Sequence, residues 1–175
     1  MSRIVFILAF VFLSSCERYP DSYPPPEQRQ PAEGGNPPPF SMMVEMSSPD
    51  ADLHIVKDVE PGSTGDYWRW TGQQPTVRVL AVTTDKLKLS CDFALWDTAF
   101  KQTGPVELSF FINDHLLDKV RYTSPGTKHF EKPVPPGWLN TDVETTVTAS
   151  IDKPYTAPQD GKKFGFILVR IGFVP

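Results

Sequence analysis

The chain has 175 residues, of which 39% are hydrophobic and 22% are charged, and its formal net charge at pH 7 is −4. This acidic balance argues against nucleic acid as a partner, because such binding needs a basic face that displaces counterions from the phosphates. The sequence contains no P-loop, dinucleotide fingerprint or G-x-S-x-G elbow, so no cofactor is expected.

The first fifteen residues have the layout of an export signal. Arg3 supplies a positive start, and an uncharged apolar run follows from Ile4 to Leu13. Ten residues are too few to cross a bilayer as a helix, which needs about 20. Small residues then lead into Cys16, and the stretch L-S-S-C at 13–16 resembles the lipobox of bacterial lipoproteins. An ordinary secretory signal with a cysteine nearby by chance is the alternative interpretation.

The lipobox resemblance implies that Cys16 becomes the first residue of the mature protein and carries the lipid, palmitate included. Two or three acyl chains give stable anchoring where one chain gives only reversible binding. The expected partner of Cys16 is therefore membrane lipid, and the expected location is the bacterial cell envelope. Glu17 favours the outer membrane, by analogy with sorting in Gram-negative bacteria. Lipidation of Cys16 leaves Cys91 without a disulfide partner.

Residues 17–39 are rich in proline, with eight prolines among 23 residues. The segment has too little apolar surface to pack, so we expect a disordered or polyproline II tether that reaches up to about 70 Å. The predicted organisation is a signal peptide at 1–15, a lipidated Cys16 with its linker at 16–39, and one folded domain at 40–175.

Alternation of apolar and polar residues predicts strands through most of residues 40–175. In 86–95 every second residue is apolar, and Cys91 belongs to that apolar set, so its side chain should point inward. Turn signals such as Pro-Gly and Asp-Gly separate the predicted strands. Besides 86–95, the predicted strands cover residues 76–83, 106–113, 143–151 and 164–174, with shorter ones at 40–46, 53–59, 117–122 and 128–134.

Eight or nine short strands without a long amphipathic helix predict an all-β fold, an antiparallel β-sandwich of jelly-roll type. One helical turn is expected in W-D-T-A-F-K, capped by Asp97. The three histidines are isolated in sequence and lack metal-ligand spacing, so we expect them on the surface or in loops.

Several turn and strand motifs carry a resemblance to a known β-sandwich module. They are W-R-W-T-G at 68–72, T-G-P at 103–105, V-E-L-S-F-F-I-N at 106–113, S-P-G at 124–126, P-V-P at 133–135 and D-G-K-K-F-G-F-I-L-V-R-I-G-F at 160–173. Together they look like a bacterial module found in small lipoproteins and in accessory domains of cell-surface glycosyltransferases. The resemblance implies a sandwich related in shape to carbohydrate-binding modules.

Aromatic residues are the strongest lead to a binding site. Amphipathic rings near strand ends and loops can stack on the apolar face of a sugar while polar groups bond its hydroxyls. For each ring, packing inside the ends of the sandwich is the alternative. The candidate ligand-binding residues are Tyr67, Trp68, Trp70, Trp96 and Trp138, and Tyr155 is of the same kind.

One residue is a candidate metal ligand. Asp160 precedes Gly161 and could contribute to a structural calcium site, although Asp-Gly is also a turn signal. The sequence indicates no other metal site.

Two functions fit these observations. The first is a membrane-anchored, non-catalytic lipoprotein whose sandwich binds a glycan or another envelope ligand. The second is a structural or accessory protein that docks on a protein partner through a sheet face or edge. No pair stands out among the 21 acidic residues as an acid–base pair, so catalysis has no support in the sequence. A sugar site needs exposed rings in a groove, whereas docking needs a flat apolar patch or an unprotected edge strand.

Replacement of the proposed lipid attachment residue tests the anchor. We expect Cys16→Ser to abolish incorporation of labelled palmitate and to release the protein from the membrane fraction, because the acyl chains supply the membrane affinity. Cys91→Ser is the matched control and should leave labelling unchanged. A Cys16→Ser protein that stays in the membrane fraction without label would contradict the prediction.

Overall fold

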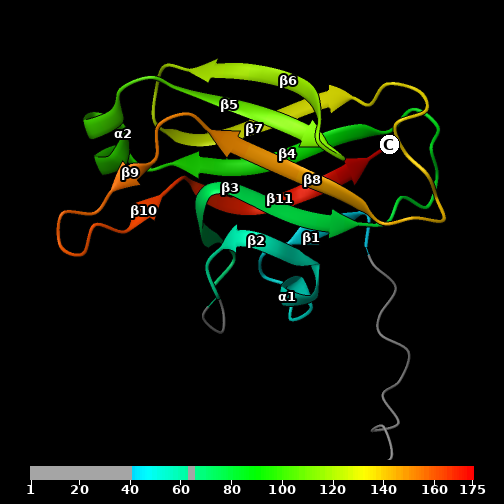
Figure 1. Cartoon of the computed structure of the whole chain (residues 1–175), viewed down its shortest axis with the longest axis horizontal. Helices are drawn as coiled ribbons and strands as arrows, with labels where there is room; N and C mark the ends of the chain where they lie inside the picture. The colour runs from blue at the N-terminus through cyan, green and yellow to red at the C-terminus, as the bar shows by residue number, and fades with distance from the viewer. Residues whose placement is uncertain (1–40, 63–65) are drawn as a thin grey trace, which may run out of the picture. The chain divides into compact units, whose positions relative to one another are not determined.

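The computed structural model describes residues 41–62 and 66–175, in which the chain forms eleven strands and two short helices (Figure 1). The expected signal peptide, Cys16 and the proline-rich linker lie outside these described residues. Neither described helix is long and apolar enough to span a membrane. In chain order the elements are β1 (Met43–Glu45), α1 (Ala51–His54), β2 (Ile55–Val59), β3 (Arg69–Val79), β4 (Lys88–Leu95), α2 (Asp97–Thr103), β5 (Val106–Ile112), β6 (His115–Tyr122), β7 (Gly126–Pro133), β8 (Thr145–Ile151), β9 (Tyr155–Thr156), β10 (Lys163–Phe164) and β11 (Ile167–Val174).

Nine of these strands form one continuous hydrogen-bonded sheet that folds into two packed layers, each of which we call a sheet below. The first, which we call the β8 sheet, has the strand order β2-β3-β8-β5-β6, and the second, the β4 sheet, has the order β1-β11-β4-β7. Every pairing described within them is antiparallel. β9 and β10 form a separate ribbon at the end of the sandwich that also carries α2 (Figure 1). The expected antiparallel β-sandwich is therefore confirmed.

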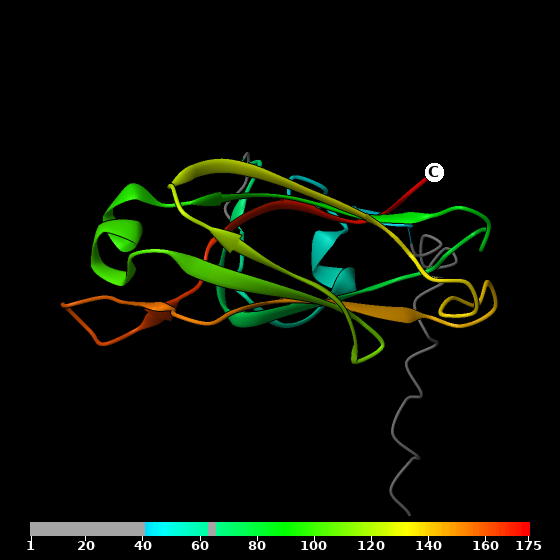
Figure 2. The same ribbon diagram turned by 90° about the horizontal axis from the view of Figure 1, so that it is seen from above.

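The core lies between the two layers, which Figure 2 shows from above. Alternate residues of β5 and β8 are buried, as expected for strands with one face inside. Phe110 of β5 stacks on Phe130 of β7, with ring centroids 3.6 Å apart and planes 7° from parallel. Phe93 of β4 packs against Phe110 at 6.5 Å and against Phe166 at 5.3 Å. Because these rings come from both sheets, their contacts hold the layers together.

β3 connects the two sheets, since its two halves pair with different neighbours. Arg69 and Trp70 pair with β11, whereas residues Thr76–Val79 pair with β8. Thr71 fixes the end near β11, because its Oγ1 donates to the Phe166 carbonyl oxygen at 2.9 Å and accepts the Phe166 N–H at 3.0 Å. This fully buried hydroxyl therefore has a partner both as a hydrogen-bond donor and as an acceptor.

The five long predicted strands are all confirmed in place, with differences at their ends. The largest difference concerns β3, which begins at Arg69 and not at Thr76, and ends at Val79. The added residues include Gly72 and Pro75, which are uncommon inside strands. In the structure, β3 accommodates both residues where it passes from one sheet to the other.

The helical prediction was right in place and wrong in its cap. Trp96 occupies the N-cap position of α2 without a side-chain cap hydrogen bond, and Asp97 is the first helical residue. A carboxylate in the first turn still interacts favourably with the positive end of the helix. α1 and the β9–β10 ribbon were not predicted, because four and two residues are too short to show a period.

One histidine also departs from expectation. His54 is buried, and its Nδ1 lies 2.9 Å from the Arg78 carbonyl oxygen, so it is part of the packing between α1 and β3. His115 and His129 are exposed, as expected, and lie on β6 and β7.

Cys91 lies in the core, which confirms the prediction from its place in the alternating pattern. The residue is fully buried on β4 and pairs with Ile171 of β11 and Phe130 of β7. Burial, with a smaller contribution from the charge of Asp92, raises the pKa of the Cys91 thiol well above its usual range. A thiol that stays protonated and covered is inert toward electrophiles.

We therefore expect Cys91 to resist a thiol reagent in the native protein and to react after denaturation. Cys91→Asp should lower the free energy of unfolding by several kcal/mol, because it buries a carboxyl group without a partner. Cys91→Ala is the control for lost volume and should cost about 1 kcal/mol. Urea unfolding measures both effects, and rapid labelling of the folded protein would refute the core assignment.

Candidate ligand-binding site

The outer face of the β4 sheet carries a hollow of about 580 Å³. Its lining comes from β4, β7 and β11 and from the segment that precedes β3. The lining residues are Tyr67, Trp68, Asp92, Ala94, Thr127, Lys128, His129, Ile167 and Val169. The hollow therefore combines two aromatic side chains, an apolar floor and a group of charged residues.

The floor of the hollow exists because a small residue faces outward from the middle of the sheet. Phe93 and Leu95 of β4 point into the core, so Ala94 between them points to the outer face. Its cross-strand partners are Ile167 of β11 and Thr127 of β7. Ala94 leaves open the space that a larger side chain would fill.

Two aromatic residues stand beside this floor. Tyr67 is 67% exposed, whereas Trp68 is half-buried. The ring of Trp68 meets that of Trp70 edge-on, with centroids 6.0 Å apart, and Trp70 in turn contacts Trp96 at 5.6 Å and Phe164 at 5.3 Å. These contacts fix the plane of the Trp68 ring before a ligand arrives, which lowers the entropy cost of binding.

A row of charged side chains crosses the sheet next to the floor. The register places Glu45 of β1 beside Arg170 of β11, Arg170 beside Asp92 of β4, and Asp92 beside His129 of β7. Arg170 Nε donates to one oxygen of Asp92 at 2.5 Å, and His129 Nδ1 donates to the other at 2.5 Å. Glu45 lies 3.9 Å from Arg170 Nη1. Opposite charges on the directly opposed residues Glu45, Arg170 and Asp92 support one another, and His129 adds a hydrogen bond at the end of the row.

Asp92 stays ionised through these contacts. Partial burial raises the pKa of the Asp92 carboxyl, but the hydrogen bonds from His129 and Arg170 outweigh burial and hold the pKa below its ordinary value. A fixed carboxylate at the edge of an apolar floor is a hydrogen-bond acceptor with a defined position. The arrangement can thus stack an apolar ring face and orient a hydroxyl group beside it.

The predicted binding residues separate into three groups. Tyr67 and Trp68 line the hollow. Trp70 and Trp96 continue the edge-on chain of rings away from it, and Trp96, 39% exposed, contacts Tyr155 at 5.6 Å. Trp138 lies apart from both groups, in a depression that it shares with the loops around Thr84 and Asn140, and its ring is 5.3 Å from His115.

Asp160, the candidate calcium ligand, is exposed in the connection between β9 and β10. Its Oδ1 accepts the Lys162 N–H at 2.9 Å, which is the pattern of a local turn. In the described part of the chain, no three His, Cys, Asp or Glu residues converge as a metal site.

Sequence reasoning missed the floor and the charged row. The alternation in 86–95 already placed Asp92 and Ala94 on the outer face. What it did not reveal was the partner strands, because Arg170 lies 78 residues from Asp92 and His129 lies 37 residues away. Only the strand order brings these side chains together.

No protein-family model and no curated protein sequence matches the chain. Similar solved structures include a family 35 carbohydrate-binding module from an environmental isolate, with 10% identity over 76% of this chain and 92% of that module, at a TM-score of 0.44. CBM35 from Paenibacillus barcinonensis has 14% identity over 76% of this chain and 98% of that chain, at 0.39. An exo-beta-1,3-galactanase from Phanerochaete chrysosporium, solved with beta-1,3-galactotriose, has 11% identity over 78% of this chain but only 29% of its own length, at 0.41. These values are too low to transfer a ligand or a site, so ligand chemistry must be inferred from this chain's own side chains.

Protonation of Asp92 should weaken the fold in acid. Because its folded pKa is lowered, its contribution to stability is complete above the unfolded pKa of about 3.9 and disappears as the pH falls through the folded pKa. We expect Asp92→Asn to be less stable than wild type at neutral pH and to lose less stability between about pH 5 and pH 2. Urea unfolding across this range measures the difference. Asp142→Asn, in the exposed loop before β8, is the control; an acid response of Asp92→Asn as steep as that of wild type would contradict the prediction.

Proposed function

We propose that this protein is a lipid-anchored, non-catalytic component of the bacterial envelope that binds a glycan in the hollow of the β4 sheet. The observation that carries the proposal is the position of Tyr67 and Trp68 beside the floor around Ala94, next to the fixed carboxylate of Asp92. Sugars are recognised by rings that cover their apolar faces and by polar groups that bond their hydroxyls.

Binding in this hollow is expected to be weak. Each stacked ring contributes about 0.5 to 1.5 kcal/mol beyond area burial, so two rings with a few hydrogen bonds give a Kd from about 1 μM to 1 mM. Affinity of that order suits a protein held by Cys16 and a long linker near a dense polysaccharide, because many sites on the polymer lie within reach.

A non-catalytic role fits the chemistry of the hollow. Hydrolysis of a glycosidic bond generally uses two carboxyl groups that stand free on either side of the bond. Among the described residues that line the hollow, Asp92 is the one carboxylate, and both of its oxygens already accept hydrogen bonds. Its role in the proposal is to position the ligand.

The edges formed by β6 and β7 are protected against docking on a protein by strand addition. β6 and β7 are edge strands, and Lys132 of β7 lies 2.9 Å from the carboxylate of Asp118 on β6. β7 also ends at Pro133, which has no N–H to donate. Charged side chains and proline on an edge strand discourage the addition of a further strand.

Titration of the full-length protein in mild detergent tests the proposal. A glycan array identifies the sugar, and tryptophan fluorescence then measures its affinity. We expect Tyr67→Ala and Trp68→Ala each to raise Kd about two- to tenfold. Ala94→Leu should abolish binding in the hollow, because it fills the floor from the solvent side without changing the core. Trp138→Ala is the matched control, because Trp138 lies in a separate depression.

Two results would refute the proposal. One is an array on which no glycan binds, which would leave docking on a protein partner as the better function. The other is a glycan whose affinity is unchanged by Trp68→Ala and Ala94→Leu in proteins that fold as wild type does.

A further inference from the structure

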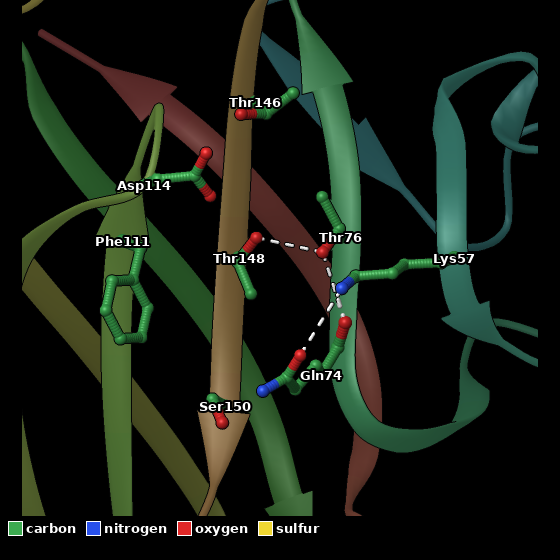
Figure 3. Close-up of a pocket in the computed structure, with 8 residues that line it drawn as sticks. All are labelled: Lys57, Gln74, Thr76, Phe111, Asp114, Thr146, Thr148 and Ser150. Atoms are coloured by element: carbon green, nitrogen blue, oxygen red, sulfur yellow. Dashed lines mark hydrogen bonds between the residues drawn. The ribbon is translucent and has the colours of Figure 1, made fainter.

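We propose that the opposite face of the sandwich carries a second, separate site for a neutral saccharide, in a trough along β8. The trough has a volume of about 320 Å³ (Figure 3). Its lining residues are Lys57, Gln74, Thr76, Phe111, Asp114, Thr146, Thr148 and Ser150. None of them lines the hollow of the β4 sheet.

The trough follows from side-chain size in neighbouring strands. β8 reads T-T-V-T-A-S-I, so Val147, Ala149 and Ile151 enter the core while Thr146, Thr148 and Ser150 face outward. Short side chains on this central strand make a low floor. Longer side chains make the walls: Lys57 reaches over β3 from β2 on one side, and Phe111 of the adjacent β5 stands on the other (Figure 3).

The register aligns three of these residues in one row across the sheet. Thr148 pairs with Thr76 of β3 on one side and with Phe111 on the other. Phe111 faces outward because its neighbours Phe110 and Ile112 occupy the core. A half-buried ring next to a hydroxyl is the same pairing of apolar and polar contact that sugars need.

The hydroxyl groups of the floor have a defined direction. Thr76 Oγ1 donates to the Gln74 carbonyl oxygen at 3.1 Å, and it lies 2.9 Å from Thr148 Oγ1. A hydroxyl has one proton, so Thr148 must be the donor to Thr76, and the oxygen of Thr148 keeps acceptor capacity toward the trough. Lys57 Nζ donates to Gln74 Oε1 at 3.3 Å, which orients the amide so that its NH₂ group is a donor.

The charges of the trough indicate a neutral ligand. Lys57 on one wall and Asp114 near the other are the charged residues among its described lining, and their formal charges cancel. A polyhydroxylated chain can pair with the Thr148 hydroxyl and the Gln74 amide, whereas an apolar peptide would leave them desolvated without partners. The floor from Thr146 to Ser150 extends about 13 Å at about 3.3 Å per residue, so the ligand lies along the strand as a short oligosaccharide.

With both sites, the protein would hold two glycan segments on opposite faces. This last step rests on the proposed function of the hollow, whereas the trough itself does not. The background for the test is therefore the full-length double variant Tyr67→Ala/Ala94→Leu, in which the hollow is blocked. Calorimetric titration uses neutral gluco-, galacto-, manno- and xylo-oligosaccharides, with uronic-acid oligosaccharides as the charged comparison.

We expect this background to bind a neutral oligosaccharide more tightly than an acidic one. Thr148→Val, which removes the hydroxyl and keeps the volume, should raise Kd about two- to tenfold. Ser150→Phe should abolish binding, because it fills the trough from the solvent side. Thr141→Val, in the exposed loop before β8, is the control and should leave Kd unchanged. Circular dichroism and the midpoint of thermal unfolding verify that each variant folds.

The outcomes separate the two sites. A blocked-hollow background that binds none of the sugars overturns the trough, as do folded Thr148→Val and Ser150→Phe variants that bind with unchanged Kd. If the trough variants weaken binding while Tyr67→Ala and Trp68→Ala have no effect in the wild-type protein, the trough stands and the proposed function of the hollow fails.

Discussion

Strand β3 is hydrogen-bonded into both sheets, and the two outer faces depend on this shared strand. Its first residues pair with β11, which brings Trp68 to the rim of the hollow in the β4 sheet. Its last residues pair with β8, which brings Thr76 to the floor of the trough. Between them the chain crosses from one layer to the other. There the Gln74 N–H donates to Asp58 Oδ2 at 2.9 Å, and this contact replaces a ladder hydrogen bond.

The crossing of β3 between the layers also restricts which residues can occupy the neighbouring positions. A Cβ on Gly165 would lie 2.1 Å from the Gly72 carbonyl oxygen, so the backbones of β3 and of the segment before β11 meet too closely for any side chain there. The buried Thr71 hydroxyl at this junction bonds both the N–H and the carbonyl of Phe166. The missing side chain at Gly165 and the two hydrogen bonds of the Thr71 hydroxyl to the Phe166 backbone thus make the change of sheet possible.

The sequence predicted the sandwich and the inward or outward direction of most side chains, because period-two alternation reports on the immediate neighbours of each residue. Cys91, Phe93 and Asp92 were all placed on the correct face in this way. It did not predict which strands lie side by side, since that depends on contacts between distant segments. The aromatic residues were therefore predicted as binding residues, but the apolar floor of the hollow beside them was not. Trp138 was grouped with rings that the fold places elsewhere. The trough was missed for a different reason: Thr146, Thr148 and Ser150 look like ordinary outward positions until the longer side chains of β2 and β5 are set beside them.

The two outer faces offer different chemistry on the same scaffold. On the β4 sheet, rings and an apolar floor adjoin a row of fixed charges, whereas on the β8 sheet hydroxyl groups form the floor and a single ring forms one wall. Because a sandwich uses only the inward half of its residues for the core, each face can vary without loss of the fold.

The anchoring of β7 has a consequence for the dynamics of the hollow. Of its eight residues only Phe130 is buried, and β4 is the one described strand to which it is hydrogen-bonded. Local opening free energies follow buried contacts, so detachment of β7 would break its pairing with β4, its ion pair to Asp118 and the burial of one side chain, Phe130. β7 carries Thr127 and His129, and its detachment would remove one wall of the hollow and one hydrogen bond to Asp92.

The trough would stay intact, because β8 is held by neighbours on both sides. A ligand that binds in the hollow as proposed would have to hold β7 in place. The free-energy cost of suppressing this fluctuation would be subtracted from what the rings and hydrogen bonds contribute to binding.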